Sequence, residues 1–274
     1  CRIHDTGRVA RGGCGAYFEH AKSCTITHNT VYNAPYCGIR CYSTLNSLET
    51  GAGSNTITCN RIHDVMQELM DGGGIMVSGR QVGTVISRNY VYDVLETSLH
   101  TTESDEFRGL YMDEGSNGIT VHHNIFANCH QSYLFHQAND CTVYNNVFAD
   151  SEVGGLWMLL GTKYLDDGQS TTYPVDMHVY NNVYVNSGGA KMYHLYIASA
   201  AYLTSMGNPF ASTHDNFFGE DEFLEQVNVT STTRAVSFLQ STYTLETDSI
   251  VGAVTLGSDW MPPLDSTAYN TGFE

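Results

Sequence analysis

Two acidic sites hold the side chains of this chain that are best suited to catalysis. Asp71 stands before a triple glycine, where the backbone can approach a ligand closely. Asp113 and Glu114 follow the apolar segment that begins at Leu110. Hydrolysis of a glycosidic bond needs one acid to protonate the leaving oxygen and a second carboxylate to act as nucleophile or base. The three carboxylates are therefore candidate catalytic residues, although Asp-Gly and Asp-Glu-Gly-Ser are also common turn sequences.

One histidine accompanies these acids. His136 takes, in its own strand, the position that Asp113 takes one repeat earlier. It could orient a carboxylate or bind a sugar hydroxyl, and a purely structural histidine fits the pattern equally well. Other histidines, such as His28 and His122, stand beside a repeated asparagine and are interpreted as surface or turn residues.

An internal repeat must position these side chains. The pattern apolar-x-x-Asn-x-apolar recurs 22 to 36 residues apart, with its asparagines at positions 29, 60, 89, 124, 146 and 182. Short β-rich runs at such a period, without any helical pattern, predict a β-solenoid. The fold class is thus all-β: a single-stranded, right-handed parallel β-helix of about eight coils. The asparagines are predicted to form a ladder of stacked amides, because a repeated buried polar group must be satisfied the same way each time.

A second short strand, usually opened by glycine, precedes each repeated asparagine. Because side chains alternate along a strand, Ile39, Ile75 and Leu110 should point inward and their neighbours outward. Outward aromatic rings beside carboxylates suit a neutral sugar, and they could equally well pack on one another. The candidate substrate-binding residues are Tyr17, Glu19, Arg40, Met76, Tyr111 and Trp157.

The repeat fades toward the end of the chain. We assign residues 1–219 to the β-helix and residues 220–274 to a β-rich C-terminal cap within the same domain, because a solenoid needs its last coil covered. Long insertions at 44–54, 96–107 and 161–176 are expected to rim a surface.

The charge of the chain limits its partners. There are 29 acidic residues against 12 basic ones, which gives a formal net charge of −17. Such a field repels nucleic acid, anionic membranes and polyuronates, so a neutral carbohydrate is favoured. There is no apolar run long enough to span a membrane. The sequence suggests no metal site and no cofactor.

The cysteines indicate the compartment. Eight cysteines without a zinc-type spacing predict disulfides and an extracellular or secreted protein. Cys14 and Cys37 each stand two residues before equivalent strand positions on neighbouring coils, so a disulfide between them is predicted. Asn228, in Asn-Val-Thr, is a candidate glycosylation site.

Several motifs resemble a known family. The segments Met70-Asp-Gly-Gly-Gly-Ile, Gly109-Leu-Tyr-Met-Asp-Glu-Gly-Ser and Phe135-His-Gln are similar to elements of glycoside hydrolase family 141 and related pectate-lyase-like β-helix proteins. The resemblance spans roughly residues 55 to 150. It implies hydrolysis of the α-L-fucosidase or xylanase type, with Asp71 and Asp113 as the catalytic pair. The chain departs from the family at Met76, where a tyrosine is usual, and it lacks the histidine that follows the Phe-His-Gln segment.

Two other functions compete with a glycoside hydrolase. A polysaccharide lyase or epimerase on the same fold needs cations to neutralise a uronate, and the chain has only three lysines, at positions 22, 163 and 191. A non-catalytic structural or adhesive β-helix is the other alternative. The chain begins in the middle of a coil, and the open strand edge there could allow self-assembly.

Overall fold

The computed structural model describes most of the first 159 residues and shorter segments beyond them. Described are residues 1–43, 52–97, 99, 107–159, 162–164, 170–172, 177–185, 194–197, 210–213, 216–218, 222–227, 230–235, 237, 241 and 250–252. Asn228 lies outside the described residues, so its glycosylation stays a prediction.

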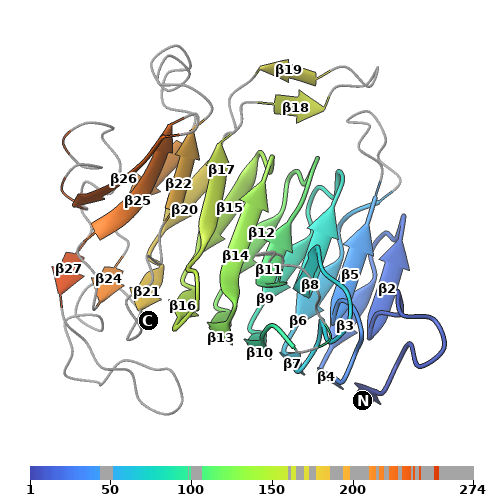
Figure 1. Ribbon diagram of the computed structural model, residues 1–274. Coiled ribbons are helices and arrows are strands. Elements are labelled where there is room, and N and C mark those ends of the chain that lie inside the picture. Colours follow the sequence, from blue (N-terminus) through green and yellow to red (C-terminus); the bar gives the residue numbers. More distant parts are fainter. Residues whose placement is uncertain are drawn as a thin grey trace.

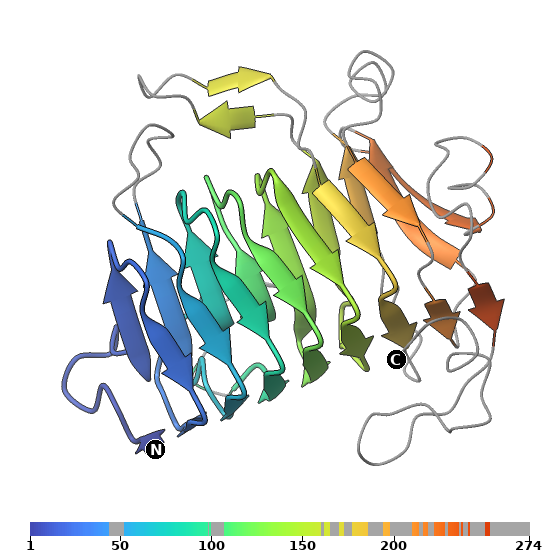
Figure 2. The same ribbon diagram turned by 180° about the vertical axis from the view of Figure 1, so that it is seen from behind.

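Three sheets of stacked strands form the sides of a solenoid (Figures 1 and 2). Sheet A consists of β1 (Arg2–His4), β4 (Thr30–Tyr32), β7 (Arg61–His63), β10 (Tyr90–Val94), β13 (Ile125–Cys129), β16 (Val147–Ala149), β21 (Val183–Val185), β24 (Asn216–Phe218) and β27 (Ile250–Gly252). Sheet B consists of β2 (Ala16–Glu19), β5 (Ile39–Tyr42), β8 (Gly72–Ser78), β11 (Phe107–Met112), β14 (Gln131–His136), β17 (Leu156–Leu159), β22 (His194–Ile197), β25 (Glu222–Val227) and β26 (Thr230–Ala235).

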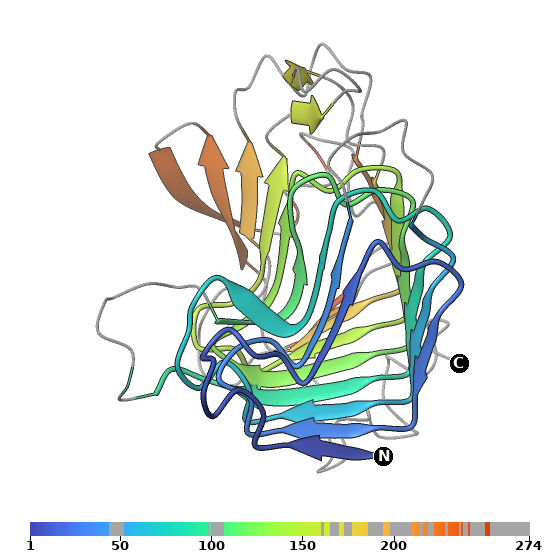
Figure 3. The ribbon, with the colours of Figure 1, turned by 90° about the vertical axis from the view of Figure 1, so that its right-hand side faces the viewer.

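The third sheet closes each coil between the other two. Sheet C consists of β3 (Thr25–Thr27), β6 (Thr56–Thr58), β9 (Val85–Ser87), β12 (Thr120–His122), β15 (Cys141–Tyr144), β20 (Met177–Tyr180) and β23 (Phe210–Thr213). The chain runs from sheet B to sheet C to sheet A and then enters sheet B of the next coil, as the view in Figure 3 shows. A separate hairpin is formed by β18 (Thr162–Tyr164) and β19 (Ser170–Thr172).

Almost all of the pairing is parallel, as expected of a β-helix. The exceptions among the described strands are the β18–β19 hairpin and the pair β25–β26. The predicted inward residues Ile39, Ile75 and Leu110 pair with one another across the coils and are fully buried. Their side chains stack into a continuous apolar core, and this burial stabilises a fold that has few local contacts. The all-β parallel β-helix predicted from the repeat is confirmed.

The asparagine ladder is also confirmed, and it occupies the corner between sheets C and A. The side-chain oxygen of Asn89 accepts hydrogen bonds from the backbone N–H and the side-chain amide of Asn60, both at 3.0 Å. Its own amide donates to the Ile57 carbonyl at 2.9 Å and to the Asn124 side chain at 3.0 Å. The residue before each ladder asparagine has a positive φ of 53 to 57°, which makes the corner sharp; these residues are His28, Cys59, Arg88, His123, Asn145 and Asn181.

The predicted cap overlaps strands that continue the solenoid. β25 pairs in parallel with β22, and β27 pairs in parallel with β24, so sheets B and A extend beyond residue 220. β26 runs antiparallel to β25 at the end of sheet B. The boundary at residues 219 and 220, and the cap itself, stay predictions, since 253–274 lie outside the described residues.

The expected alignment of the first two coils is correct, while the disulfide is not formed in the structure. Ala16 pairs with Ile39, and the backbone N–H of Gly15 donates to the Cys37 carbonyl at 3.0 Å. Cys14 and Cys37 are both free thiols, and they hydrogen-bond to each other. Their oxidation to a disulfide stays a prediction, which a non-reducing peptide map would test.

Candidate active site

A cleft of about 420 Å³ opens on the outer face of sheet B. The strands β8, β11 and β14 position it, because the register places Met76, Tyr111 and Leu134 side by side on consecutive coils. All three predicted acids and His136 lie in this one cleft. Its lining residues are Asp71, Arg108, Tyr111, Asp113, Glu114, Leu134 and His136.

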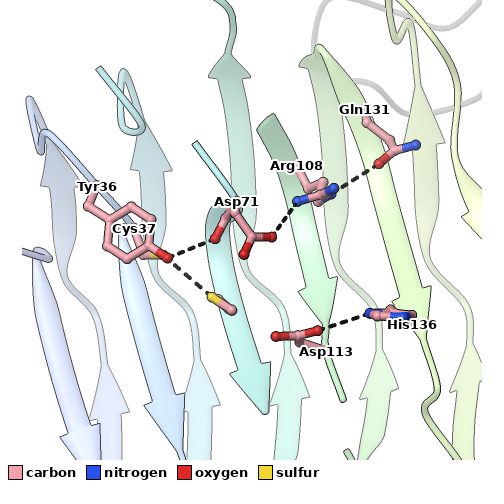
Figure 4. A network of polar contacts seen from close by, with 8 residues as sticks. Tyr36, Cys37, Asp71, Arg108, Asp113, Gln131 and His136 are labelled. Carbon is pink, nitrogen blue, oxygen red and sulfur yellow. Dashed lines mark hydrogen bonds and ion pairs between the residues drawn. The ribbon is translucent and has the colours of Figure 1, made fainter. Parts of the chain in front are cut away.

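Asp113 stands directly after β11 and is held from several sides. Its backbone N–H donates to the Val77 carbonyl at 2.8 Å, which fixes it against the preceding coil. Its carboxylate lies 3.1 Å from Nδ1 of His136 on the next coil (Figure 4). This contact confirms the predicted neighbourhood of the acid and the imidazole.

The surroundings of Asp113 favour its ionised form. Partial burial favours the protonated acid, but hydrogen bonds from His136, from the backbone N–H of Glu114 and from the Tyr111 hydroxyl outweigh it. The pKa of Asp113 is therefore below its ordinary value. The pKa of Tyr111 is raised, first by burial and second by the negative charge of Asp113, so its hydroxyl stays a proton donor.

Asp71 lies at the opposite end of the β8–β11 pair, immediately before β8. Its φ of 55° is left-handed, and its carbonyl accepts a hydrogen bond from the Tyr36 hydroxyl at 2.7 Å. Glycine is required next in the chain, because a Cβ at Gly72 would lie 2.8 Å from the Cys37 sulfur and from the Tyr36 ring. The glycine run thus serves close packing between coils, and it leaves the Asp71 carboxylate in the cleft with 62% of the side chain exposed.

Arg108 connects the two ends of the cleft. One terminal nitrogen of its guanidinium lies 3.3 Å from the Asp71 carboxylate, and its Nε donates to the Gln131 side chain at 3.2 Å (Figure 4). The same guanidinium lies over the Tyr111 ring, 4.3 Å from its centre. With 9% of its side chain exposed, Arg108 is a buried cation that contacts both Asp71 and the tyrosine bonded to Asp113.

Glu114 lines the same cleft, although strict alternation predicts that it turns away from the face of Tyr111 and Asp113. The reason is that β11 ends at Met112 and the chain then turns, with the Ser116 N–H donating to the Asp113 carbonyl at 3.0 Å. Alternation along a strand does not extend into such a turn. Three carboxylates are therefore among the described residues that line the cleft.

Comparison with known proteins agrees with this architecture. A family model described as the right-handed β-helix region matches residues 1–199. The chain belongs to the right-handed β-helix family. Membership in glycoside hydrolase family 141 stays a prediction.

Comparisons beyond the family are sparse. No curated protein matches the sequence of this β-helix protein. A solved structure similar to it is the periplasmic alginate epimerase AlgG, with 12% sequence identity and a TM-score of 0.41. That similarity covers 93% of this chain and 54% of the epimerase chain, so the β-helix protein spans about half of the epimerase.

The predicted aromatic shelf of this β-helix protein is not an open surface. Tyr17 is half exposed, but Met76, Tyr111 and Leu134 are only 2 to 4% exposed. Arg108 covers Tyr111, as described above. Among the predicted substrate-binding residues whose side chains the structure describes, Tyr111 alone lines the cleft.

The expected register fails at Trp157. Trp157 pairs with Phe135, an inward position, and it is Leu156 that pairs with Leu134. The shift follows from Gly155, since a Cβ there would lie 2.1 Å from the buried Tyr133 ring. Gly155 therefore lies against the Tyr133 ring, and Leu156 takes the position beside Leu134 that the repeat pattern assigns to Trp157. A place for Trp157 in the outward column is thus wrong.

Arg40 and Glu19 lie on coils before the cleft. The Arg40 guanidinium is surrounded by Tyr17, Tyr36 and Tyr42, with its central carbon 5.5 to 6.0 Å from the three ring centres. Its cationic face is thus occupied by the protein itself. Glu19 is exposed at the end of β2. Their roles in substrate binding stay predictions.

Sequence reasoning missed Arg108 and Gln131. Arg108 has the same parity as the core residues Leu110 and Met112, so alternation assigns it to the interior. A buried, isolated charge is costly, and this cost is the signal that could have found it. No cluster of three or more metal-ligating side chains occurs among the described residues. No helix in the described part of the chain has the length and apolar character needed to cross a membrane.

Proposed function

We propose that the chain is a glycoside hydrolase whose active site is the cleft on sheet B. The observation that carries this proposal is the convergence of Asp71, Asp113 and Glu114 in one cleft, with Asp113 held in its ionised form. Glycosidic cleavage requires two carboxyl groups in opposite protonation states. A cleft of this size accommodates a small part of a glycan.

Asp113 is assigned the role of the ionised carboxylate. Its lowered pKa makes it a poor proton donor and a competent nucleophile or base. His136 and Tyr111 donate to it and fix its orientation, so they are positioning residues. The bond that breaks is the one between the anomeric carbon and the leaving oxygen, and water supplies the hydroxyl group of the new reducing end.

The second carboxyl group is Asp71, as the family resemblance implies, or Glu114. Asp71 is the more exposed acid, and its carboxylate lies 3.3 Å from the Arg108 guanidinium. For Asp71 to contact the leaving oxygen of a sugar, the bound sugar must take the place of the guanidinium at this carboxylate. Glu114 lies next to Asp113 and needs no such displacement. Separate variants of the two residues decide between them.

The test is hydrolysis of fucosides and xylo-oligosaccharides by the wild type and by Asp113→Asn, Asp71→Asn and Glu114→Gln. Asp113→Asn keeps the shape and should lower turnover by about a thousandfold or more. The variant of the true proton donor should cause a loss of the same order. The double variant should lose little beyond the worse single one, because groups that act as a unit are not additive.

Asp64→Asn is the matched control. Asp64 also bonds to the Nδ1 of a histidine, His63, at 2.7 Å, but it lies on sheet A away from the cleft. The control should keep full activity and the melting temperature of the wild type. Undiminished hydrolysis by Asp113→Asn would refute the assignment. A wild type that cleaves no glycan would favour the structural or adhesive alternative.

The buried guanidinium of Arg108 supports a second candidate, a polysaccharide lyase or epimerase. A uronate carboxylate needs a cation to stabilise the charge that develops when the C5 proton is removed, and Arg108 lines the cleft beside Tyr111 and His136. A lyase leaves a new C4=C5 double bond, and an epimerase incorporates solvent deuterium at C5 without cleavage. Either product from a polyuronate, with no hydrolysis of neutral glycosides, would replace the hydrolase proposal.

A further inference from the structure

A second hollow lies on a different edge of the coil, at the corner between sheets C and A. It has a volume of about 430 Å³ and is lined by His28, Asn29, Thr30, Cys59, Asn60, Arg61, Arg88 and Tyr90. In Figure 3 the strands of sheet C descend on the right and join those of sheet A below, and this corner holds the asparagine ladder. We call the three residues His28, Arg61 and Arg88 the basic corner.

The basic corner is exceptional in a chain with a net charge of −17. No aspartate or glutamate is among the residues that line the hollow. Several arginines elsewhere in the described part of the chain meet acids: Arg11 lies 3.1 Å from Glu68, and Arg108 lies 3.3 Å from Asp71. Arg61 and Arg88 form no ion pair with any described residue. Uncompensated cations in an acidic protein create a local positive potential that attracts an anion.

Arg61 is held in place for such a contact. Its Nε donates to the Tyr92 hydroxyl at 2.8 Å, and its guanidinium lies 5.1 Å from the centre of the Tyr92 ring. Tyr92 is itself stacked between other rings of sheet A, at 4.8 Å from His63 and 4.4 Å from Tyr90. The two terminal nitrogens of the Arg61 guanidinium donate to no described residue. A guanidinium fixed in this way loses little conformational entropy when it binds a carboxylate or a sulfate.

The positive charge of Arg88 affects two histidines on the next coil. Burial lowers the pKa of His122 and His123 on the next coil, and the positive charge of Arg88 lowers both further. Arg88 is exposed and has the positive φ of the corner column, so its side chain starts outside the core. The charge is thus available to solvent and is not neutralised locally.

The basic residues follow the long axis of the solenoid. Thr30, Arg61 and Tyr90 occupy one column of sheet A on three consecutive coils, and His28, Cys59 and Arg88 occupy the corner column of the same coils. Consecutive coils are roughly 4.8 Å apart. The three cationic or ionisable groups therefore follow the axis on three consecutive coils, in two neighbouring columns, and this arrangement suits a linear polyanion that runs parallel to the axis.

We propose that the basic corner is a second carbohydrate-binding site, which takes the carboxylate or sulfate groups of an acidic polysaccharide. The site is separate from the cleft, and it does not depend on the hydrolase proposal. The net charge predicts that the surface as a whole repels polyanions. The basic corner is a local exception to this repulsion. At roughly 0.15 M salt, charges more than about 8 Å away are largely screened while direct contacts persist.

The test is calorimetric titration near 0.15 M salt with polygalacturonate, dextran sulfate and neutral dextran. Arg61→Gln/Arg88→Gln should weaken binding of the acidic polymers by at least about tenfold, because hydrogen bonds to charged groups are among the stronger polar contacts. Arg11→Gln is the control for charge, since Arg11 is an exposed arginine paired with Glu68 outside the corner. It should change the affinity less than about twofold. Binding of polygalacturonate alone identifies a carboxylate site, and binding of dextran sulfate alone identifies a sulfate site.

The cleft variants Asp113→Asn and Arg108→Gln separate the two proposals. Both should leave binding at the corner unchanged, whether or not the wild type hydrolyses a glycan. The inference is overturned if neutral dextran binds as tightly, if Arg11→Gln weakens binding as much as the corner variants, or if only Arg108→Gln weakens it. Tighter binding of single-stranded DNA than of either acidic glycan would assign the corner to nucleic acid and would likewise overturn it.

Discussion

The asparagine ladder and the cleft on sheet B are both polar, and they lie on the same coils. In the ladder, consecutive described coils from Asn29 to Asn182 contribute the same residue, and Asn60, Asn89 and Asn124 are nearly inaccessible to solvent and hydrogen-bonded in the same way. In the cleft, successive coils contribute Asp71, then Arg108 and Asp113, then Gln131 and His136, and each is bonded differently.

This difference distinguishes polar groups that stabilise the fold from polar groups that are available to a ligand. A polar group that is repeated by every coil can only satisfy its neighbours, because each member is used by the next. A polar group that occurs on one coil has no equivalent partner on the next coil. In the cleft, different side chains of neighbouring coils supply its hydrogen bonds. We infer that departures from the repeat, more than the repeat itself, mark where a solenoid contacts its ligand.

The largest expected effect is on stability, in the ladder. Asn89→Ala removes four hydrogen bonds and takes from the buried backbone N–H of Asn60 the side-chain oxygen to which it donates. A buried unsatisfied group costs about 1 to 3 kcal/mol and each of the three other hydrogen bonds contributes about 1 kcal/mol, so we expect a loss of roughly 3 to 6 kcal/mol in the free energy of unfolding. Urea denaturation followed by circular dichroism measures it.

Asn29→Ala is the control, because Asn29 is less buried and bonds to only one neighbouring ladder asparagine, Asn60. It should cost roughly 1 kcal/mol or less. Equal losses in the two variants would mean that the stability does not come from the ladder bonds.

The second effect concerns the cleft and falls mainly on activity. Arg108→Met keeps the aliphatic stem over Tyr111 but removes the charge that contacts Asp71 and Gln131. We expect a stability loss of about 1 to 3 kcal/mol, because Gln131 keeps a buried acceptor without its donor. Turnover should fall by more than the loss of stability explains. Arg108→Lys should keep part of the turnover, because it keeps the positive charge.

The measurement is kcat and KM for the best glycan substrate, with the melting temperature of each variant. If the role of Arg108 is structural alone, Arg108→Met should be fully active at temperatures where it is folded. Full kcat in folded Arg108→Met would show that the guanidinium does not position Tyr111 and, through it, Asp113. The contrast between ladder and cleft would then not extend to Arg108.

The sequence predicts the repeating part of the molecule far better than the cleft. The ladder and the inward columns follow from a sequence pattern that recurs from coil to coil, so the fold was predictable. The same pattern places Asp113 and His136 at equivalent positions of neighbouring coils, so their proximity was predictable too. Trp157 was misplaced because one buried ring, Tyr133, displaced the register by one residue. Arg108 was missed because strict alternation gives it the same face as Leu110. A Cβ at Gly109 would meet the buried Cys129 and Phe126, so alternation breaks between Gly109 and Leu110, and Arg108 lies on the side of Tyr111.

A third effect is a difference in pH dependence. The pKa of Asp113 is lower in the folded protein than its ordinary value of 3.8. Its contribution to stability is therefore complete above that value and is lost as the pH falls through the lower folded value. The wild type should lose stability on acidification more steeply than Asp113→Asn. The ladder variant Asn29→Ala carries no ionisable change, and its stability curve should run parallel to that of the wild type.

The smallest effect is expected where a charge is exposed. Asp71→Asn removes an ion pair with Arg108, but the Asp71 side chain is 62% exposed, so water and salt screen the pair. We expect the melting temperature to change by no more than about 2 °C, in line with a loss below about 1 kcal/mol. The backbone contact to the Tyr36 hydroxyl survives the substitution, because it uses the carbonyl and not the carboxylate. If Asp71 acts in catalysis, activity should nevertheless fall by orders of magnitude, whereas Asn29→Ala, with a comparable effect on stability, should keep its activity. A large drop in melting temperature for Asp71→Asn, with turnover reduced only in proportion, would make Asp71 a structural residue like those of the ladder.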